Sequence, residues 1–134
     1  MRRLACLLAL VATLAGCGAQ GAAGGDFEGT EREVADVLED LQETAQAGDE
    51  QRVCTLLARE LVQRLQQGGV PCPRAVSAAL DDADTFEVSV RDVQVSGTTA
   101  TARIAPGTAE DAPVDTVRLV REGANWRIAS LGEA

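Results

Sequence analysis

The residue best placed for chemistry in this chain is Cys17, which directly follows Leu14-Ala15-Gly16. Before it, Met1-Arg2-Arg3 gives the chain a positive start, and the apolar run from Leu4 to Leu14 is almost entirely Leu, Ala and Val. A positive start, a short apolar stretch and small residues before a cleavage point are typical of a secretory signal. The thiol of Cys17 would stand immediately after that point.

This stretch resembles the bacterial lipobox, in which the thiol is diacylglyceryl-modified and becomes the first residue of the mature chain. The resemblance implies that residues 1–16 are a lipoprotein signal peptide. It also implies a lipid anchor at Cys17 on the extracytoplasmic face of the cell membrane. A transmembrane anchor is disfavoured, because a span needs about 20 apolar residues and this run is shorter. Cleavage by the ordinary signal peptidase would suit Ala15 and Gly16, but it leaves Cys17 unexplained.

The composition indicates one acidic domain. The net charge is −9, and loss of Arg2 and Arg3 with the signal lowers it to −11. This charge argues against a nucleic-acid partner, which requires clustered cations, and against electrostatic docking on anionic lipid. All twelve basic residues are Arg, as in proteins from GC-rich genomes such as those of actinobacteria.

The four cysteines fall into two groups. Cys6 lies in the signal and Cys17 carries the lipid, which leaves Cys54 and Cys72 in the domain. An even pair in an exported chain favours a structural disulfide. The residues favour a zinc site or a catalytic thiol less, because the chain has no His and the two cysteines lack C-x-x-C spacing. The sequence gives no reason to expect a metal or another cofactor.

The chain after Cys17 divides into a tether and a domain. Residues 17–29 hold the lipidated cysteine and a Gly/Ala-rich segment, and about ten such residues span roughly 15–20 Å. Residues 30–132 form the domain, and its first half predicts three helices. The first begins with a capping box of Thr30 and Glu33. The second is capped by Asp49 and continues to Gly68, and the third opens at Pro71-Cys72-Pro73.

The second half of the domain predicts strands, because apolar residues alternate with polar ones. The first strand begins at Phe86, and a phase slip at Arg91-Asp92 indicates a β-bulge. Three further strands are expected around Ala100–Ile104, Val114–Arg121 and Trp126–Leu131. Three helices followed by a four-stranded antiparallel meander define an α+β domain.

Two stretches carry a resemblance to a known family: Gly48-Asp49 through Leu57, and the ending from Leu119 to Ile128. The ending is similar to a "charged residue–Gly–x–x–Trp–basic–Ile" close. With the order of elements, these stretches resemble the cystatin-like fold of the nuclear-transport-factor-2-like superfamily. The paired cysteines resemble those of small actinobacterial lipoproteins of this type. The resemblance implies three helices packed on a curved sheet that encloses a cone.

Trp126 and Asp92 are the candidate residues for a pocket in that cone. Trp126 either lines the pocket or anchors the core beneath the helices, and the bulge gives Asp92 a way to point inward. Enzymes of the superfamily, of the ketosteroid-isomerase or hydratase kind, use a pocket Asp with Tyr or His partners. This chain has no Tyr and no His. We therefore expect a non-catalytic domain that binds an unidentified partner protein or small apolar ligand. The alternative is a small isomerase- or hydratase-like enzyme that uses a pocket carboxylate.

Overall fold

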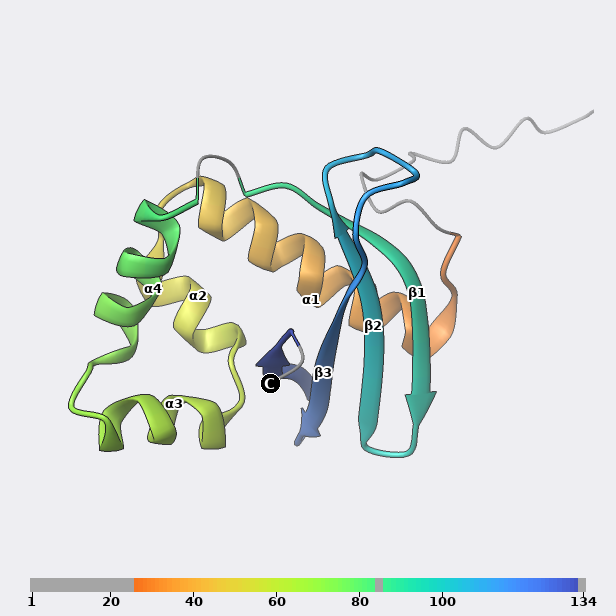
Figure 1. The fold of residues 1–134 in the computed structure, drawn as a ribbon. Coiled ribbons are helices and arrows are strands. Elements are labelled where there is room, and N and C mark those ends of the chain that lie inside the picture. Colours follow the sequence, from red (N-terminus) through yellow and green to blue (C-terminus); the bar gives the residue numbers. More distant parts are fainter. Residues whose placement is uncertain (1–25, 84–85, 133–134) are drawn as a thin grey trace, which may run out of the picture.

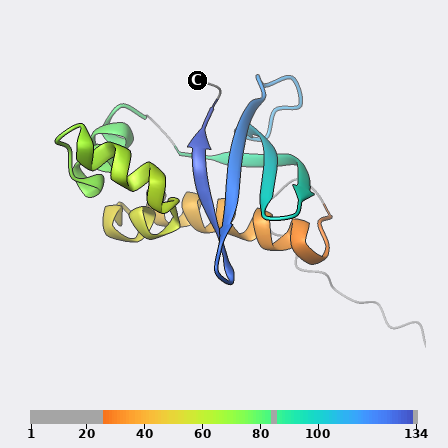
Figure 2. The same cartoon turned by 90° about the horizontal axis from the view of Figure 1, so that it is seen from below.

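The structure is a computed structural model that describes residues 26–83 and 86–132. The signal, Cys17 and most of the tether lie outside the described residues. Within them the first and longest helix packs across one face of an antiparallel sheet, and the three shorter helices gather beside its last strand (Figures 1 and 2). No described helix has both the length and the apolar character needed to cross a bilayer.

The elements follow the predicted order of helices and then strands. The helices are α1 (Gly29–Gln46), α2 (Glu50–Leu56), α3 (Arg59–Gln67) and α4 (Cys72–Asp81). The strands are β1 (Val88–Ser96), β2 (Thr99–Pro106), β3 (Asp115–Glu122) and β4 (Asn125–Leu131). They form one antiparallel sheet in the order β1-β2-β3-β4. The predicted α+β class and antiparallel meander are confirmed.

The expected second helix, from Asp49 to Gly68, is wrong as a single element, because it divides into α2 and α3. Leu57 has extended backbone angles and forms a parallel bridge with Ile128. The Ala58 N–H donates to the Ile128 carbonyl at 2.7 Å. Pairing with the outer edge of β4 therefore overrides the local helical preference. The domain has four helices in its described residues, not three.

Of the two helix caps predicted from the sequence, one is wrong and one is confirmed. The Thr30 capping box is wrong, because α1 begins at Gly29 with Glu28 at the N-cap position and no side-chain cap. The Asp49 cap is confirmed, because its Oδ1 accepts from the Arg52 N–H at 3.0 Å. The backbone therefore turns into α1 without the side-chain bond that the sequence suggested.

The core lies between α1 and the inner face of the sheet. Trp126 is 2% exposed and belongs to this core. So do the small residues Ala100 and Ala102 of β2. The cluster consists of Val34, Leu38, Leu41, Ala45, Val53, Leu56, Leu57, Cys72, Val90, Val93, Ala100, Ala102, Val117, Leu119, Trp126 and Ile128.

A disulfide ties the smaller helices together. Cys54 in α2 and Cys72 at the start of α4 are bonded, with 6.1 Å between their Cα atoms, a distance within the usual range for such bridges. The predicted pairing is confirmed. The bond encloses α3, so the segment between the two cysteines is held at both ends.

The sheet contains two irregularities. The predicted bulge in β1 is confirmed, because the register with β2 shifts between Val90 and Asp92. A second shift occurs where Arg118 pairs with Ser130 but Leu119 pairs with Ile128, which leaves Ala129 as an extra residue in β4. Such an extra residue bends its strand locally. The sequence did not indicate this second bulge.

Side chains and backbone from the helices reach both edges of the sheet. At the β1 edge, Gln42 Oε1 accepts from the Val88 N–H at 2.6 Å, and Gln46 Nε2 donates to the Phe86 carbonyl at 2.8 Å. At the β4 edge, the Leu57–Ala58 link makes the bridge described above. The helices are thus connected to the sheet by hydrogen bonds as well as by apolar packing.

Candidate ligand-binding cleft

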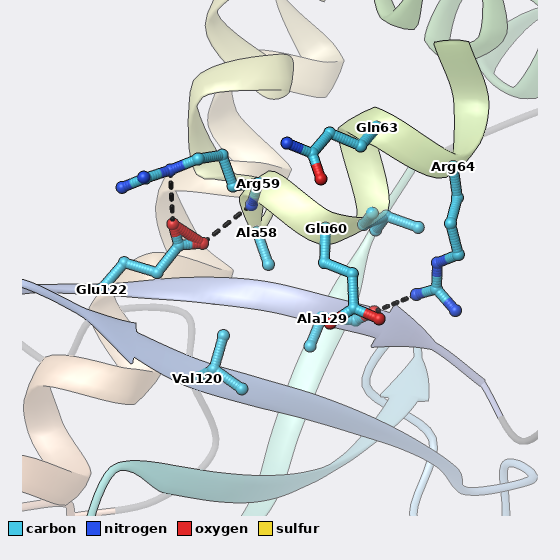
Figure 3. Close-up of a pocket in the computed structure, with 9 residues that line it drawn as sticks. Ala58, Arg59, Glu60, Gln63, Arg64, Val120, Glu122 and Ala129 are labelled. Carbon is cyan, nitrogen blue, oxygen red and sulfur yellow. Dashed lines mark hydrogen bonds and ion pairs between the residues drawn. The ribbon is translucent and has the colours of Figure 1, made fainter. Parts of the chain in front are cut away.

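A cleft of about 580 Å³ lies between α3 and the strands β3 and β4 (Figure 3). Val120 in its floor faces away from α1, because its neighbour Leu119 is fully buried in the core and successive strand residues point to opposite faces. The cleft therefore opens on the outer face of the sheet, which is the face away from α1. Its lining residues are Ala58, Arg59, Glu60, Leu61, Gln63, Arg64, Val120, Glu122 and Ala129.

Glu122 holds α3 in place over this cleft. Its Oε1 accepts from the Arg59 backbone N–H at 2.7 Å, and its Oε2 lies 3.4 Å from Arg59 Nε. Ala58, at the N-cap position, offers no side-chain cap. Glu122 therefore caps α3 from a position 63 residues away, and its negative charge suits the positive end of the helix dipole.

Arg64 makes the second contact between α3 and the sheet. Its Nη2 lies 3.4 Å from the Ala129 carbonyl, at the residue that the bulge adds to β4. Figure 3 shows the side chain directed from α3 toward that strand. The guanidinium therefore contacts β4 at its bulge, where the regular pairing between β3 and β4 is interrupted.

The cleft combines apolar and polar lining residues. Ala58, Leu61, Val120 and Ala129 supply apolar surface, and the remaining lining residues are charged or amide side chains. Such an arrangement suits a small molecule with an apolar body and a polar head.

The residues predicted from sequence for a pocket lie elsewhere. Trp126 is in the core, where its Nε1–H donates to Glu33 Oε2 at 3.3 Å. Asp92 lies at the β1 bulge, and its Oδ2 accepts from the Nε2 of the exposed Gln94 at 3.3 Å. Neither residue lines the cleft.

Sequence reasoning missed the residues that do line it, above all Glu122, Arg59 and Arg64. Strand alternation would have placed Val120 and Glu122 on the outer face. The location of α3 over that face depends on the break at Leu57–Ala58, and local periodicity gives no signal for it.

Two kinds of comparison find no relative: no protein-family model and no curated protein matches the chain.

Solved structures do match. A proposed dehydratase of the NTF2-like family from Streptomyces avermitilis superposes with a TM-score of 0.53 and 14% identity, over 76% of this chain and 92% of the other. A proposed NTF2-like transpeptidase from Campylobacter jejuni superposes with a TM-score of 0.48 and 11% identity, over 72% of this chain and 97% of the other. At such identities the similarity of the first structure is one of fold. Together with the helices-then-meander architecture, it shows that residues 29–131 have the NTF2-like fold.

Proposed function

We propose that this chain is a lipoprotein anchored through Cys17 at the extracytoplasmic face of the cell membrane. We also propose that its domain binds a ligand without catalysing a reaction. The residues around Cys17 support the anchor. The Cys54–Cys72 disulfide supports export, because such bonds persist in oxidising compartments and are rare in the cytosol.

The observation that carries the binding role is the cleft beneath α3. Its volume of about 580 Å³ falls in the range of small-molecule sites. Val120 and Ala129 offer an apolar surface to the body of a ligand, and Arg64 and Glu60 offer polar groups at the rim. The ligand class is therefore a small molecule that is partly apolar.

The arrangement of carboxylates favours binding over catalysis. Glu122 is engaged with the backbone and side chain of Arg59, so it is poorly placed to accept a proton from a substrate. Glu60 also lines the cleft, but the chain has no His or Tyr to act with it. Asp92, on which the enzyme alternative depended, contacts Gln94 instead. A lone carboxylate is weak support for acid–base chemistry.

Metabolic labelling with radioactive palmitate tests the anchor. The wild-type chain should incorporate label, the Cys17→Ala variant should not, and the Cys6→Ala variant should label normally because Cys6 lies within the signal. A diacylglyceryl group carries two acyl chains, which anchor a protein stably, whereas a single acyl chain gives only marginal membrane binding. Label retained by Cys17→Ala would show that the lipobox interpretation is wrong.

Affinity capture from native membranes, with mass spectrometry of the bound molecules, tests the cleft. Val120→Trp fills the cleft and should eliminate the co-purifying ligand. Gln94→Trp, on the same sheet face but on β1, is the matched control and should retain it. If both variants retain the same bound molecules, the cleft is not the binding site.

A further inference from the structure

Three arginines form a diagonal stripe on the outer face of the sheet. Arg103 on β2 pairs with Thr116, and Arg118 follows two residues later on β3. Arg127 on β4 pairs with Val120, again two residues beyond Arg118. Diagonal neighbours on a sheet lie about 7–8 Å apart. Each strand from β2 to β4 therefore presents one guanidinium in a continuous arginine stripe.

The guanidiniums of the arginine stripe are available to a partner. Within residues 26–83 and 86–132 none of the three takes part in an ion pair. Arg118 has a weak contact from Nε to Ser130 Oγ at 3.4 Å. Arg103 and Arg118 are exposed and Arg127 is partly exposed.

Carboxylates are few on this face. On the strands they are Asp92, which is directly opposite Arg103 and is bonded to Gln94, and Glu122, paired with Arg59. Glu60 on α3 lines the cleft on this face. Glu110 and Asp111 lie in the loop after β2, at the Arg103 end of the stripe. The stripe thus runs away from these two acids toward β4.

A large group of acids lies on the other side, where α1 alone carries six of the 21 acidic residues of the chain. Figure 2 shows α1 lying across one face of the sheet. The buried residues of this helix include none of its acids. A helix with its side chains is about 10–12 Å across, and the Debye length at physiological salt is about 8 Å. Acids on the far side of α1 are therefore largely screened from anything that contacts the arginine stripe. The net charge, −9 for the full chain and −11 without the signal, does not describe this face. Net charge therefore does not argue against docking of this face on anionic lipid.

The neighbours of the arginine stripe indicate what it binds. Besides Asp92 opposite Arg103 and Val120 opposite Arg127, they are hydroxyl side chains: Thr101, Thr116 and Ser130. Guanidiniums with hydroxyl donors suit phosphate oxygens. Protein interfaces instead concentrate aromatic anchors at their centres, and no aromatic residue lies on β2, β3 or the outer positions of β4.

We propose that the arginine stripe docks the domain on the anionic phospholipid headgroups of the membrane that carries its anchor. This inference rests on the proposed lipid anchor. Eight residues separate Cys17 from Asp26, and a chain of that length reaches at most about 30 Å. The domain therefore stays within contact distance of the bilayer. Because Arg127 pairs with Val120, docking also brings the cleft to headgroup level, where a lipid-borne ligand would reach it.

Vesicle co-sedimentation of the mature chain, from residue 17 onward with Cys17→Ser, tests docking without the lipid. The core cluster lies wholly within this chain, and circular dichroism checks that each variant is folded. The probes are vesicles of phosphatidylglycerol and of phosphatidylcholine. One variant carries Arg103→Gln, Arg118→Gln and Arg127→Gln. The matched control carries Arg32→Gln, Arg52→Gln and Arg74→Gln, which remove the same charge from the helices.

The wild-type chain should bind phosphatidylglycerol vesicles at about 0.01 M salt and be released at about 1 M, where the Debye length has fallen about tenfold. A basic residue near an anionic surface contributes about fivefold to partitioning, so the stripe variant should lose about a hundredfold. The control should change about twofold or less. Equal binding to both lipids, no binding at low salt, or an equal loss in the control would overturn the proposal. These results do not depend on palmitate labelling, so failure of docking and failure of the anchor are distinguishable.

Discussion

The indole of Trp126 on β4 is hydrogen-bonded to the Glu33 carboxylate on α1, with Nε1 and Oε2 3.3 Å apart and the residues 93 positions apart in the chain. Arg121 completes the group: its guanidinium carbon lies 5.7 Å from the Trp126 ring centroid, and its Nη2 lies 3.8 Å from Glu33 Oε2. The one polar atom of Trp126, the largest side chain of the core, thus has a hydrogen-bond acceptor in the partly exposed Glu33 carboxylate.

Replacement of Trp126 by Ala should therefore lower the free energy of unfolding by about 3–5 kcal/mol, mainly through the cavity it leaves. Glu33→Gln should lower it by less than about 1 kcal/mol, because the Glu33 side chain is 54% exposed. Urea denaturation followed by circular dichroism measures both. A larger loss in Glu33→Gln than in Trp126→Ala would contradict the assignment of Trp126 to the core.

The sequence predicts helix caps at both Asp49 and Thr30, and the structure confirms only Asp49. Asp49→Ala should lower the free energy of unfolding by about 1 kcal/mol, because the Arg52 N–H loses its acceptor. Thr30→Ala should have little effect, because no side-chain cap is present at the start of α1. Thermal or urea unfolding of the two variants side by side tests this. An equal loss in both would restore the capping box.

Removal of the Glu122 carboxylate should loosen the first turn of α3. Glu122→Ala leaves the Arg59 N–H without its partner, at a cost of about 1 kcal/mol, similar to the loss of an ordinary N-cap. Hydrogen exchange at the α3 amides should accelerate while exchange in the β2–β3 ladder is unchanged. Glu60→Ala, in the same turn, is the control. The cap assignment fails if Glu60→Ala accelerates exchange as much.

Loss of the Cys54–Cys72 bond should destabilise the domain by about 3 kcal/mol, the value that loop-closure entropy gives for a loop of this length. The separation of the two cysteines is 18 residues. The double variant Cys54→Ser, Cys72→Ser, compared with the wild type under oxidising conditions, measures the effect. The denaturation midpoint of the reduced wild type should be similar to that of the double variant. No difference between oxidised and reduced chains would mean that the bond carries no stability.

Those parts of the fold that depend on short-range patterns could be predicted. Alternation located all four strands, and the phase slip at Arg91–Asp92 gave the first bulge because a bulge shifts which residues face the core. The Cys54–Cys72 pair followed from counting cysteines in a chain whose N-terminal segment predicts export. In each case the signal lies within the segment itself or in the composition.

Those parts that depend on distant segments could not. The break at Leu57–Ala58 occurs because Ile128 offers a hydrogen-bond partner 70 residues later. The cleft follows from that break together with Glu122, and the bulge at Ala129 leaves no phase slip that the sequence makes visible. The candidate site was therefore missed because distant parts of the chain had to meet before it existed.

The hydrogen bonds at the two sheet edges restrict how this domain can associate. An uncovered edge strand invites another chain to extend the sheet, by recognition or by aggregation. Here the Leu57–Ala58 link lies against β4. The side-chain amides of Gln42 and Gln46 form hydrogen bonds with the backbone around the start of β1. Strand addition is obstructed at these points, so another chain, including a second copy of this one, has less opportunity to extend the sheet there.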